Sequence, residues 1–408
     1  MKIVELNEQT YKEYASIHSK RNFGQTIEYS RIEANRNKET LLLGMMDDYD
    51  NIYAAALILV RNVSTGIKEA VAPNGFLIDY SDFNLVKEFT NLLRNYLFKE
   101  RITYLITNPM FKYHVYNKKN IMIENNENIY DNLLKLDYRS IGYFSDFEHY
   151  DIIIENDISS NDIYRNFNRN TKRNIKEGLN LGITLHKGTI NDLPLAYEII
   201  KKKNKRTYHF YENLMHIYNT KDNKMEVFFA RLNPHKYLVN IQKLYEKEKI
   251  NNEKIHQKFE HNIGHINEKL LNKKINSDNT LSKYNQELQK AILINNKYDK
   301  DIIIGTSIVI KNNHEIYFLA DGYNEEFRYI HSTHILKWAI IRKYFELGYR
   351  IFNLGEIHKD YFDKSSKYYG QYKYKLGFGG NIIEYTPNLL LVINKPLYSI
   401  YTKINRKK

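Results

Sequence analysis

The chain has 408 residues, 42% of them hydrophobic, and its 61 lysines and arginines against 48 acidic residues give a formal net charge of +13. This length supports two or more hydrophobic cores, and the absence of cysteine excludes disulfides, thiolate metal sites and cysteine nucleophiles. The polar N-terminus excludes a signal peptide, and no apolar run reaches the roughly 18–20 residues that span a bilayer, so we expect a cytoplasmic protein. The charge fits a polyanionic partner, although AT-rich coding, visible in abundant Asn, Lys, Ile and Tyr, explains it equally well.

Residues 1–145 predict a first domain of mixed α/β structure. The apolar segments 40–46 and 52–60 read as paired strands. Seven apolar residues recur at helical spacing between positions 85 and 97, and a short strand follows at 104–107. This order of elements is typical of an α/β unit.

Residues 146–241 and 299–408 predict a second α/β domain. Its expected elements are a strand at 149–155, a helix at 161–180, strands at 224–232 and 236–241, a hairpin of 302–310 with 314–322 that turns at Asn312-Asn313, a helix around Trp338 and a strand at 349–354. A strand, an acidic loop, a helix and another strand follow one another at 76–107 and again at 316–354. This repetition indicates two copies of one α/β unit.

Residues 242–298 differ from both domains because they are highly polar and contain no proline. Apolar residues recur along the segment at helical spacing, and NSDN at 276–279 is a turn signal. We therefore predict an antiparallel coiled-coil arm, inserted between two strands of the second domain. A disordered lysine-rich loop is the alternative, and the apolar seam argues against it.

The usual nucleotide-binding motifs are absent. The chain lacks GxxxxGK[ST] and GxGxxG, which excludes P-loop and dinucleotide binding. The repeated unit suggests an acetyltransferase, but the segment that would hold the acyl-CoA pyrophosphate, 328–334, contains no glycine. His331 and His334 lie three residues apart without a third ligand at useful spacing, so packing is the better interpretation. We therefore expect no metal site.

The segment YYGQYKYKLGFGG at 368–380 interleaves tyrosines with lysines and ends in glycines. Aromatic rings stack on bases for roughly 1–3 kcal/mol each and lysines hold phosphates, so the segment is a candidate nucleic-acid contact. A lysine here could also stabilise an oxyanion during acyl transfer. On pattern alone, an edge strand with its tyrosines inward is the better interpretation. The basic helix within 167–185 is a second candidate phosphate contact, with a solvated face as its alternative.

Several segments together carry a family resemblance. They are APNGFLIDY (72–80), FNRNTKRNIKEGLNLGITL (167–185), Tyr317-Phe-Leu-Ala, Glu325-Glu-Phe-Arg328, Lys337-Trp338, Gly348-Tyr-Arg-Ile-Phe-Asn-Leu-Gly355, Tyr372-Lys-Tyr-Lys-Leu-Gly-Phe378 and Ile383-Glu-Tyr385. In combination they resemble the FemABX family of non-ribosomal peptidyltransferases, over nearly the whole chain and most strongly from about residue 300. The helical arm is similar to the coiled coil of several members.

The resemblance implies two tandem acetyltransferase-like (GNAT-like) domains with an inserted arm. It implies transfer of an amino acid, with glycine, serine or alanine favoured, from aminoacyl-tRNA to an amine of a lipid-linked or UDP-linked peptidoglycan precursor. The aminoacyl ester is already activated, so the enzyme must position the amine beside the carbonyl and stabilise the oxyanion. No cofactor is implied.

The resemblance also assigns roles to individual residues. Lys375 matches the lysine that stabilises the oxyanion, and Tyr374 stands where an aromatic residue contacts the terminal adenosine of the tRNA. Tyr372 and Lys373 belong to the same donor-binding strip. For the phosphates of the acceptor, the candidates are Arg31, which follows the motif Gln25-Thr-Ile-Glu-Tyr29, and Arg206.

One position departs from the family pattern. Some members have an aspartate, once discussed as the general base, where this chain has Asn108 before Pro109, and asparagine cannot accept a proton. Either this position is not the base, or a substrate carboxylate or the tRNA ribose serves instead.

Two other functions stay open. One is a related transferase that acts on an acceptor other than a peptidoglycan precursor. The other is a catalytically inactive tRNA-binding protein of the same fold. The basic, amphipathic segment 397–408 could contact a membrane surface, and a solvated tail is its alternative.

Overall fold

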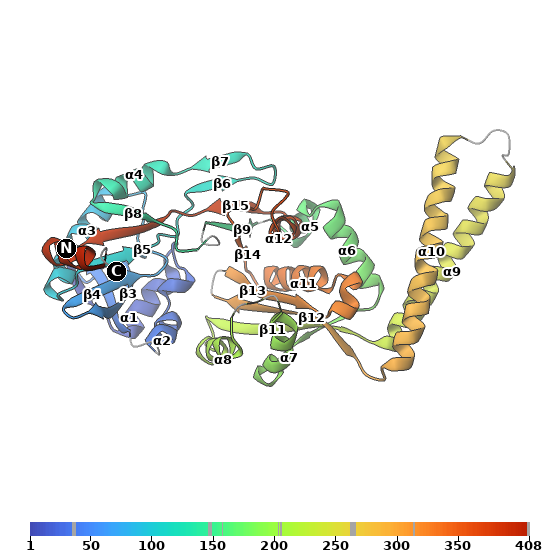
Figure 1. The fold of residues 1–408 in the computed structure, drawn as a ribbon, viewed down its shortest axis with the longest axis horizontal. Helices are drawn as coiled ribbons and strands as arrows, with labels where there is room; N and C mark the ends of the chain where they lie inside the picture. The colour runs from blue at the N-terminus through green and yellow to red at the C-terminus, as the bar shows by residue number, and fades with distance from the viewer. Residues whose placement is uncertain are drawn as a thin grey trace.

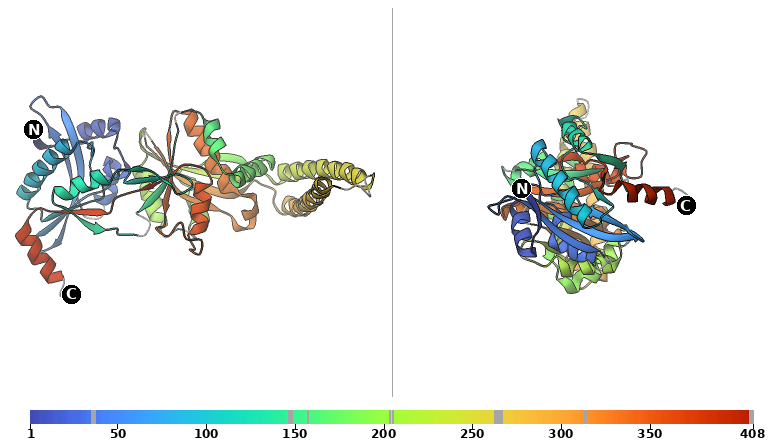
Figure 2. Two further views of the ribbon diagram at one scale, coloured as in Figure 1. Left: turned by 90° about the horizontal axis from the view of Figure 1, so that it is seen from above. Right: turned by 90° about the vertical axis from the view of Figure 1, so that its left-hand side faces the viewer.

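In the computed structural model, the described residues are 1–34, 38–145, 149–156, 158–202, 204, 206–261, 267–312 and 315–405. Two β-sheets form an elongated body, and a pair of long helices projects from one end of it (Figure 1). Both ends of the drawn chain lie at the first sheet, as two directions of view agree (Figure 2). The predicted mixed α/β fold is therefore confirmed. The predicted turn residue Asn313 and the last three residues of the basic tail lie outside the described residues.

The first sheet has seven strands, and both of its faces are covered. Their spatial order is β1 (Lys2–Glu5), β2 (Glu39–Met46), β3 (Ile52–Ser64), β4 (Ile67–Ala72), β5 (Tyr104–Thr107), β16 (Asn388–Val392) and β8 (Tyr138–Gly142). Alternate residues of β3 pack toward α3 (Phe83–Lys99) on one face and toward α1 (Glu8–Ile17) and α2 (Ile27–Ala34) on the other. This double burial explains why β3 reads as an unbroken apolar run.

The second sheet has nine strands. Their order is β10 (Thr184–Lys187), β11 (Lys224–Leu232), β12 (Ile302–Lys311), β13 (Glu315–Tyr323), β14 (Ile351–Ile357), β9 (Tyr150–Glu155), β15 (Asn381–Glu384), β6 (His114–Tyr116) and β7 (Met122–Asn125). Ile316 and Phe318 of β13 pack toward α11 (Ser332–Glu346), whereas Tyr317 and Leu319 pack toward α7 (Leu193–Ile200) and α8 (Tyr208–Ile217). The two faces of this sheet therefore serve separate cores.

The predicted repeat is present in both sheets. β4 and β5 pair in parallel across α3, and β13 and β14 pair in parallel across α11. A helical crossover is the connection that parallel neighbours require. The two copies of one α/β unit are therefore confirmed.

The sheets cross the predicted domain boundaries in both directions. The C-terminal strand β16 lies between β5 and β8 of the first sheet. In exchange, β6 from the N-terminal half pairs with β15 of the second sheet. Each sheet is thus built from both halves of the chain, and the helix α4 (Glu127–Lys135) connects β7 back to β8.

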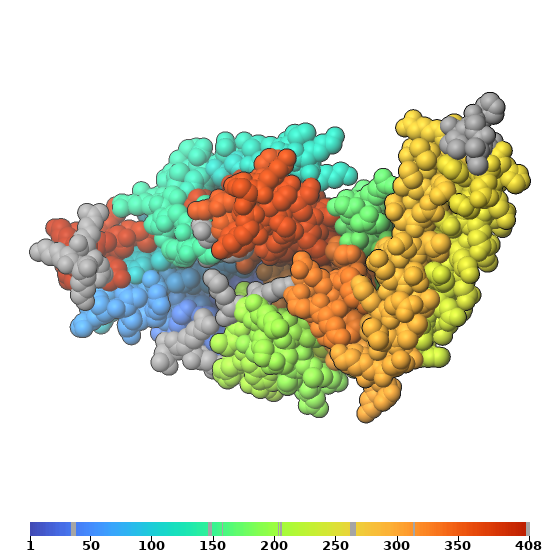
Figure 3. Space-filling view, turned by 45° about the vertical axis from the view of Figure 1, so that its right-hand side comes forward, coloured from blue at the N-terminus to red at the C-terminus, as the bar shows by residue number. Residues whose placement is uncertain are grey.

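The inserted arm consists of α9 (Pro234–His261) and α10 (Glu268–Lys297), which pack against each other and project beyond the body (Figure 3). The expected strand at 236–241 is wrong, because Asn233 accepts a hydrogen bond from the Lys236 amide and begins a helix that buries Tyr237 and Ile241 one turn apart. Within the described residues, no helix is long and apolar enough to cross a membrane.

The expected turn at 276–279 is also wrong, because these residues lie inside α10. Their polar side chains bond across the arm instead of turning the chain. Ser277 Oγ donates to Glu248 Oε1 at 2.6 Å, and Asn252 Nδ2 donates to Asp278 Oδ1 at 2.7 Å. The two helices run in opposite directions, since Lys274 lies near Phe259 and Ser277 near Glu248.

The helix expected at 161–180 is divided in two. α5 (Ser160–Asn166) ends at Phe167, and α6 (Arg169–Asn180) begins where Asn168 Oδ1 accepts from the Thr171 amide at 2.7 Å. The remaining helices are α12 (Tyr369–Leu376) and the C-terminal α13 (Lys395–Asn405). Together, α6, α11 and α12 form the layer on one face of the second sheet that carries the candidate site.

Candidate active site

The tyrosine- and lysine-rich segment forms the helix α12, so the edge-strand interpretation is wrong. Neighbours on a helix differ by about 100°, so Tyr374 and Lys375 diverge without the backbone turn that a strand would need. Gly377 follows the helix, and a Cβ atom there would meet Thr171 Oγ1 of α6 at 2.4 Å. Glycine therefore allows α12 to dock closely onto α6.

Lys375 reaches from α12 to an opening in the second sheet. β13 and β14 pair only as far as Tyr317 and Asn353, although both strands continue beyond this point. The Lys375 ammonium donates to the Glu356 carbonyl at 2.8 Å in the region where the strands have separated. Gly355, with φ of +85°, makes room: a Cβ atom there would lie 3.2 Å from both Lys375 Nζ and the Phe318 carbonyl.

The surroundings of Lys375 lower the pKa of its ammonium group. Burial of the ammonium lowers its pKa from 10.5 to about 8, and the positive charge of Lys337 acts in the same direction, while nearby carboxylates oppose both. The group is still mostly charged near pH 7. A partly desolvated ammonium interacts more strongly with a developing oxyanion than one in bulk water.

The aromatic residues predicted for donor binding have different surroundings. Tyr374 packs edge-on against His334 at 4.9 Å between ring centroids. Tyr372 is 3% exposed and belongs to the core beside Tyr361, whereas the Lys373 side chain is exposed to solvent. Of these three residues, Lys373 is the exposed one, Tyr374 is partly buried and Tyr372 is buried.

A fully buried lysine lies beside this helix, and the sequence did not indicate it. Lys337 of α11 has no exposed surface, and its ammonium lies 2.7 Å from Asp321 Oδ2 and 3.8 Å from the centre of the Phe318 ring. Ser307 Oγ donates to the other Asp321 oxygen at 2.6 Å. Burial lowers the pKa of Lys337, and Asp321 opposes that shift. The two partners act on Lys375 in opposite directions, since Lys337 lowers its pKa and Asp321 raises it.

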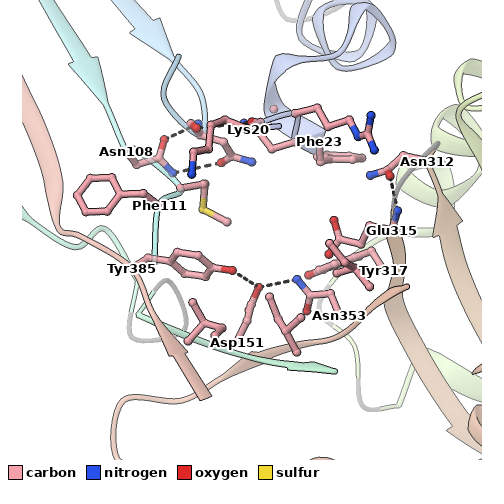
Figure 4. A pocket seen from close by; sticks show the side chains of 18 of the residues that line it. Lys20, Phe23, Asn108, Phe111, Asp151, Asn312, Glu315, Tyr317, Asn353 and Tyr385 are labelled. Atoms are coloured by element: carbon pink, nitrogen blue, oxygen red, sulfur yellow. Dashed lines mark hydrogen bonds between the residues drawn. The ribbon is translucent and has the colours of Figure 1, made fainter. Parts of the chain in front are cut away.

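A cavity of about 830 Å³ opens on the opposite face of the second sheet, between the two sheets. Figure 4 shows Lys20, Phe23 and Asn108 from the first half of the chain on one side of it. The other side holds Asp151, Glu315, Tyr317 and Asn353 of the second sheet, together with Tyr385, which directly follows β15 (Figure 4). Glu356, whose carbonyl accepts from Lys375, also lines the cavity, whereas Lys375 itself is not among the lining residues.

Two carboxylates on the sheet face this cavity. Asp151 is 5% exposed, and its Oδ2 accepts from Asn353 Nδ2 at 2.8 Å and from the Tyr385 hydroxyl at 3.3 Å. Burial raises the pKa of Asp151, and these two hydrogen bonds oppose the shift. Burial and the charge of Asp151 raise the pKa of Glu315 to about 7. Two like charges in a low-dielectric wall resist simultaneous ionisation.

Asn108 has a structural role. Its Oδ1 accepts from the Asn74 amide at 2.8 Å, and its Nδ2 donates to Asn74 Oδ1 at 3.3 Å. Both ends of the side-chain amide therefore brace the turn around Asn74, whose φ is +59°. The residue borders the cavity without offering it a proton acceptor.

The structure separates the two arginines predicted for phosphate binding. Arg206 lines the cavity, with its guanidinium 4.9 Å from the centre of the Phe210 ring. Arg31 is not among the lining residues and pairs with Glu8 at 2.9 Å, with both side chains more than half exposed. Lys20 and Arg21, which the sequence did not single out, add positive charge to the first-domain side of the cavity.

Comparison with known proteins places the fold and the family of the chain. The structure is similar to the crystal structure of FemX, with a TM-score of 0.74 and 17% sequence identity. The superposition covers 98% of this chain and 99% of the FemX chain. The FemAB family matches residues 6–406, and the chain belongs to that family.

Two curated relatives extend over the whole chain. Aminoacyltransferase FemA of Staphylococcus epidermidis is 24% identical over 429 residues and covers all of both chains. Aminoacyltransferase FemA of Staphylococcus aureus strain N315 is 23% identical over 423 residues, which are 100% of this chain and 99% of the relative. The recognition made from the motifs is therefore confirmed.

Proposed function

We propose that the protein is an aminoacyltransferase that moves an amino acid from aminoacyl-tRNA to an amine of a peptidoglycan precursor. Membership of the FemAB family and the name of the relatives, aminoacyltransferase FemA, support this reaction class. The observation that carries the proposal is the position of the Lys375 ammonium in the opening between β13 and β14. The helix α12 lies on one side of that opening and the cavity on the other.

In the proposed reaction, the acceptor nitrogen attacks the ester carbonyl that links the amino acid to the tRNA ribose. The carbonyl oxygen becomes negatively charged in the tetrahedral intermediate, and the Lys375 ammonium donates to it. An ammonium has three donors, so the bond to the Glu356 carbonyl leaves two for the oxyanion. Stabilisation of a charge that exists only around the transition state raises the rate of the chemical step.

The two substrates approach from opposite faces of the sheet in this proposal. The tRNA end contacts α12, where Tyr374 and Lys373 lie, and the basic residues of α6 continue the positive surface toward the tRNA backbone. The precursor enters the cavity, where Arg206 and Lys20 attract its phosphates. The reacting atoms meet at the opening in the sheet, which aligns the amine with the ester.

A transfer assay tests the proposal. Purified protein is mixed with total tRNA charged with labelled amino acids and with lipid-linked or UDP-linked precursor, alongside Lys375→Met. Label should appear in the precursor, identify the amino acid, and be lost with the variant. Transfer only to another acceptor would support the related transferase, and salt-sensitive tRNA binding without transfer would support an inactive tRNA-binding protein.

A further inference from the structure

Neither Asp151 nor Glu315 contributes to oxyanion stabilisation or to phosphate binding in the proposed aminoacyl transfer. The side chains come from adjacent parts of one sheet, since Asp151 lies on β9 and Glu315 on β13, with β14 between them. Asn353 of β14 donates to Asp151 at 2.8 Å, and Glu315 lies beside the same amide on the cavity wall (Figure 4). Within the described part of the chain, neither carboxylate has an ion-pair partner.

Lys375 acts on Asp151 from beyond ion-pair distance, whereas another carboxylate of the same cavity is directly paired. Glu155 lines the same cavity and pairs with Lys112 at 2.7 Å. An unpaired buried carboxylate is costly in its charged form, so it either binds a proton or is stabilised by a positively charged ligand. The acceptor of the proposed reaction is an amine, which is a cation in solution near pH 7 and must lose a proton before it can attack.

The pair also lies on the path to the reacting atoms. Asp151 is the strand partner of Glu356, whose carbonyl accepts from Lys375. Glu315 is two residues before Tyr317, where the pairing of β13 with β14 ends. An ammonium group held by this pair is therefore next to the opening through which Lys375 reaches the ester.

We propose that Glu315, backed by Asp151, binds the ammonium group of the acceptor and takes its proton, an inference that rests on the proposed aminoacyl transfer. Glu315 is the partly exposed member of the pair and touches the amine, while Asp151 is a positioning residue. Glu315 would thus act as the general base, a role that Asn108 cannot perform because an asparagine side chain does not accept a proton.

The acceptor ammonium loses two protons in this reaction. One proton passes from the ammonium to the Glu315 carboxylate and is later released to solvent. The free amine forms the new C–N bond, the bond between the carbonyl carbon and the ribose oxygen breaks, and the second nitrogen proton ends on that ribose oxygen. The products are an amide, a free ribose hydroxyl and one proton, and no oxidant or cofactor takes part.

The pH dependence of this step follows from the groups around Glu315. Besides Asp151, the groups near the pair are Glu155, Tyr317, Asn353, Glu356, Tyr385, Arg206 and Lys375. With a Glu315 pKa of about 7, transfer should rise with pH through 7. The charge of Asp151 raises that pKa, so its removal should move the rise to lower pH.

The first experiment compares Glu315→Gln, Asp151→Asn and a matched control, Glu346→Gln, which alters an exposed residue of α11. In transfer assays, Glu315→Gln should lower kcat by about 10²–10⁴-fold, the usual contribution of a positioned proton acceptor, and remove the rise near pH 7. Asp151→Asn should keep the rise but shift it to lower pH, and the control should match the wild type. An unchanged rate and pH profile in Glu315→Gln would overturn the inference. If Lys375→Met lost transfer in that same case, the proposed function would still stand.

A second measurement does not depend on turnover. Calorimetric binding of a UDP-linked muropeptide at pH 6.5, in two buffers of different ionisation enthalpy, counts the protons released. Wild type should release most of one proton for the free amine and none for the same compound with its amine acetylated, and Glu315→Gln should release none for either. Equal proton release by wild type and Glu315→Gln, or no binding of the free amine, would overturn the inference even if no protein transfers an amino acid.

Discussion

Replacement of Lys375 by methionine should stabilise the fold while it abolishes transfer. Burial lowers the pKa of this lysine from 10.5 to about 8, so the charged form is disfavoured in the folded protein by about 3 kcal/mol, at 1.36 kcal/mol per pKa unit. Loss of the hydrogen bond to the Glu356 carbonyl offsets about 1 kcal/mol of this. We therefore expect Lys375→Met to be more stable than wild type by about 2 kcal/mol at pH 7.

The pH dependence of this difference identifies its cause. Below pH 8 the lysine is protonated in both the folded and unfolded states, so the difference stays constant. Between pH 8 and 10.5 the unfolded state binds more protons, so the wild type gains about 1.4 kcal/mol per pH unit relative to the variant, and the difference shrinks.

Urea unfolding of both proteins, followed by fluorescence, measures this difference. Trp338 is the only tryptophan and lies on α11 in the same part of the fold as Lys375, so it reports the relevant transition. A stability difference that does not change between pH 7 and 10 would refute the desolvation of Lys375, whatever its effect on transfer.

Three further changes separate the parts of the site. Gly355→Ala should abolish transfer and destabilise the fold by about 1–2 kcal/mol, since its φ of +85° disfavours a side chain; normal kcat would contradict the narrow opening. Arg206→Ala should raise KM for the precursor about tenfold while Arg31→Ala leaves it unchanged, and equal effects in steady-state kinetics would argue against the cavity as the acceptor site. Lys337→Met should lower the free energy of unfolding, measured in urea, by about 3–5 kcal/mol, and Asp321→Asn in the same chain should recover part of this loss.

The sequence predicts the parts of this fold that depend on local pattern. Apolar segments predicted β2, β3 and β11. The repeated strand–helix–strand order predicted the two α/β units that contain the parallel pairs. The helix α12 was missed because tyrosine is a good strand former, although Tyr369, Tyr372 and Leu376 recur at intervals of three and four. That spacing marks the face that packs on the core.

The site itself depends on contacts that no local pattern encodes. Lys375 was found through its motif, but the opening it reaches exists only because β13 and β14 separate after Tyr317. The sequence does contain a signal for Asp151, because a carboxylate at the start of the apolar run DIII indicates a buried charged residue. Glu315 and Arg206 meet the same cavity through tertiary packing, so their relation could not be predicted from spacing.

The exchange of strands between the two sheets also constrains how the protein is made. β16 fills the position between β5 and β8, so the first sheet is interrupted until residues 388–392 have left the ribosome. During synthesis, the N-terminal half therefore exposes two unpaired strand edges while the rest of the chain, including the arm, is being translated. A chain that ends shortly before β16 therefore lacks the strand that joins β5 to β8 in the first sheet.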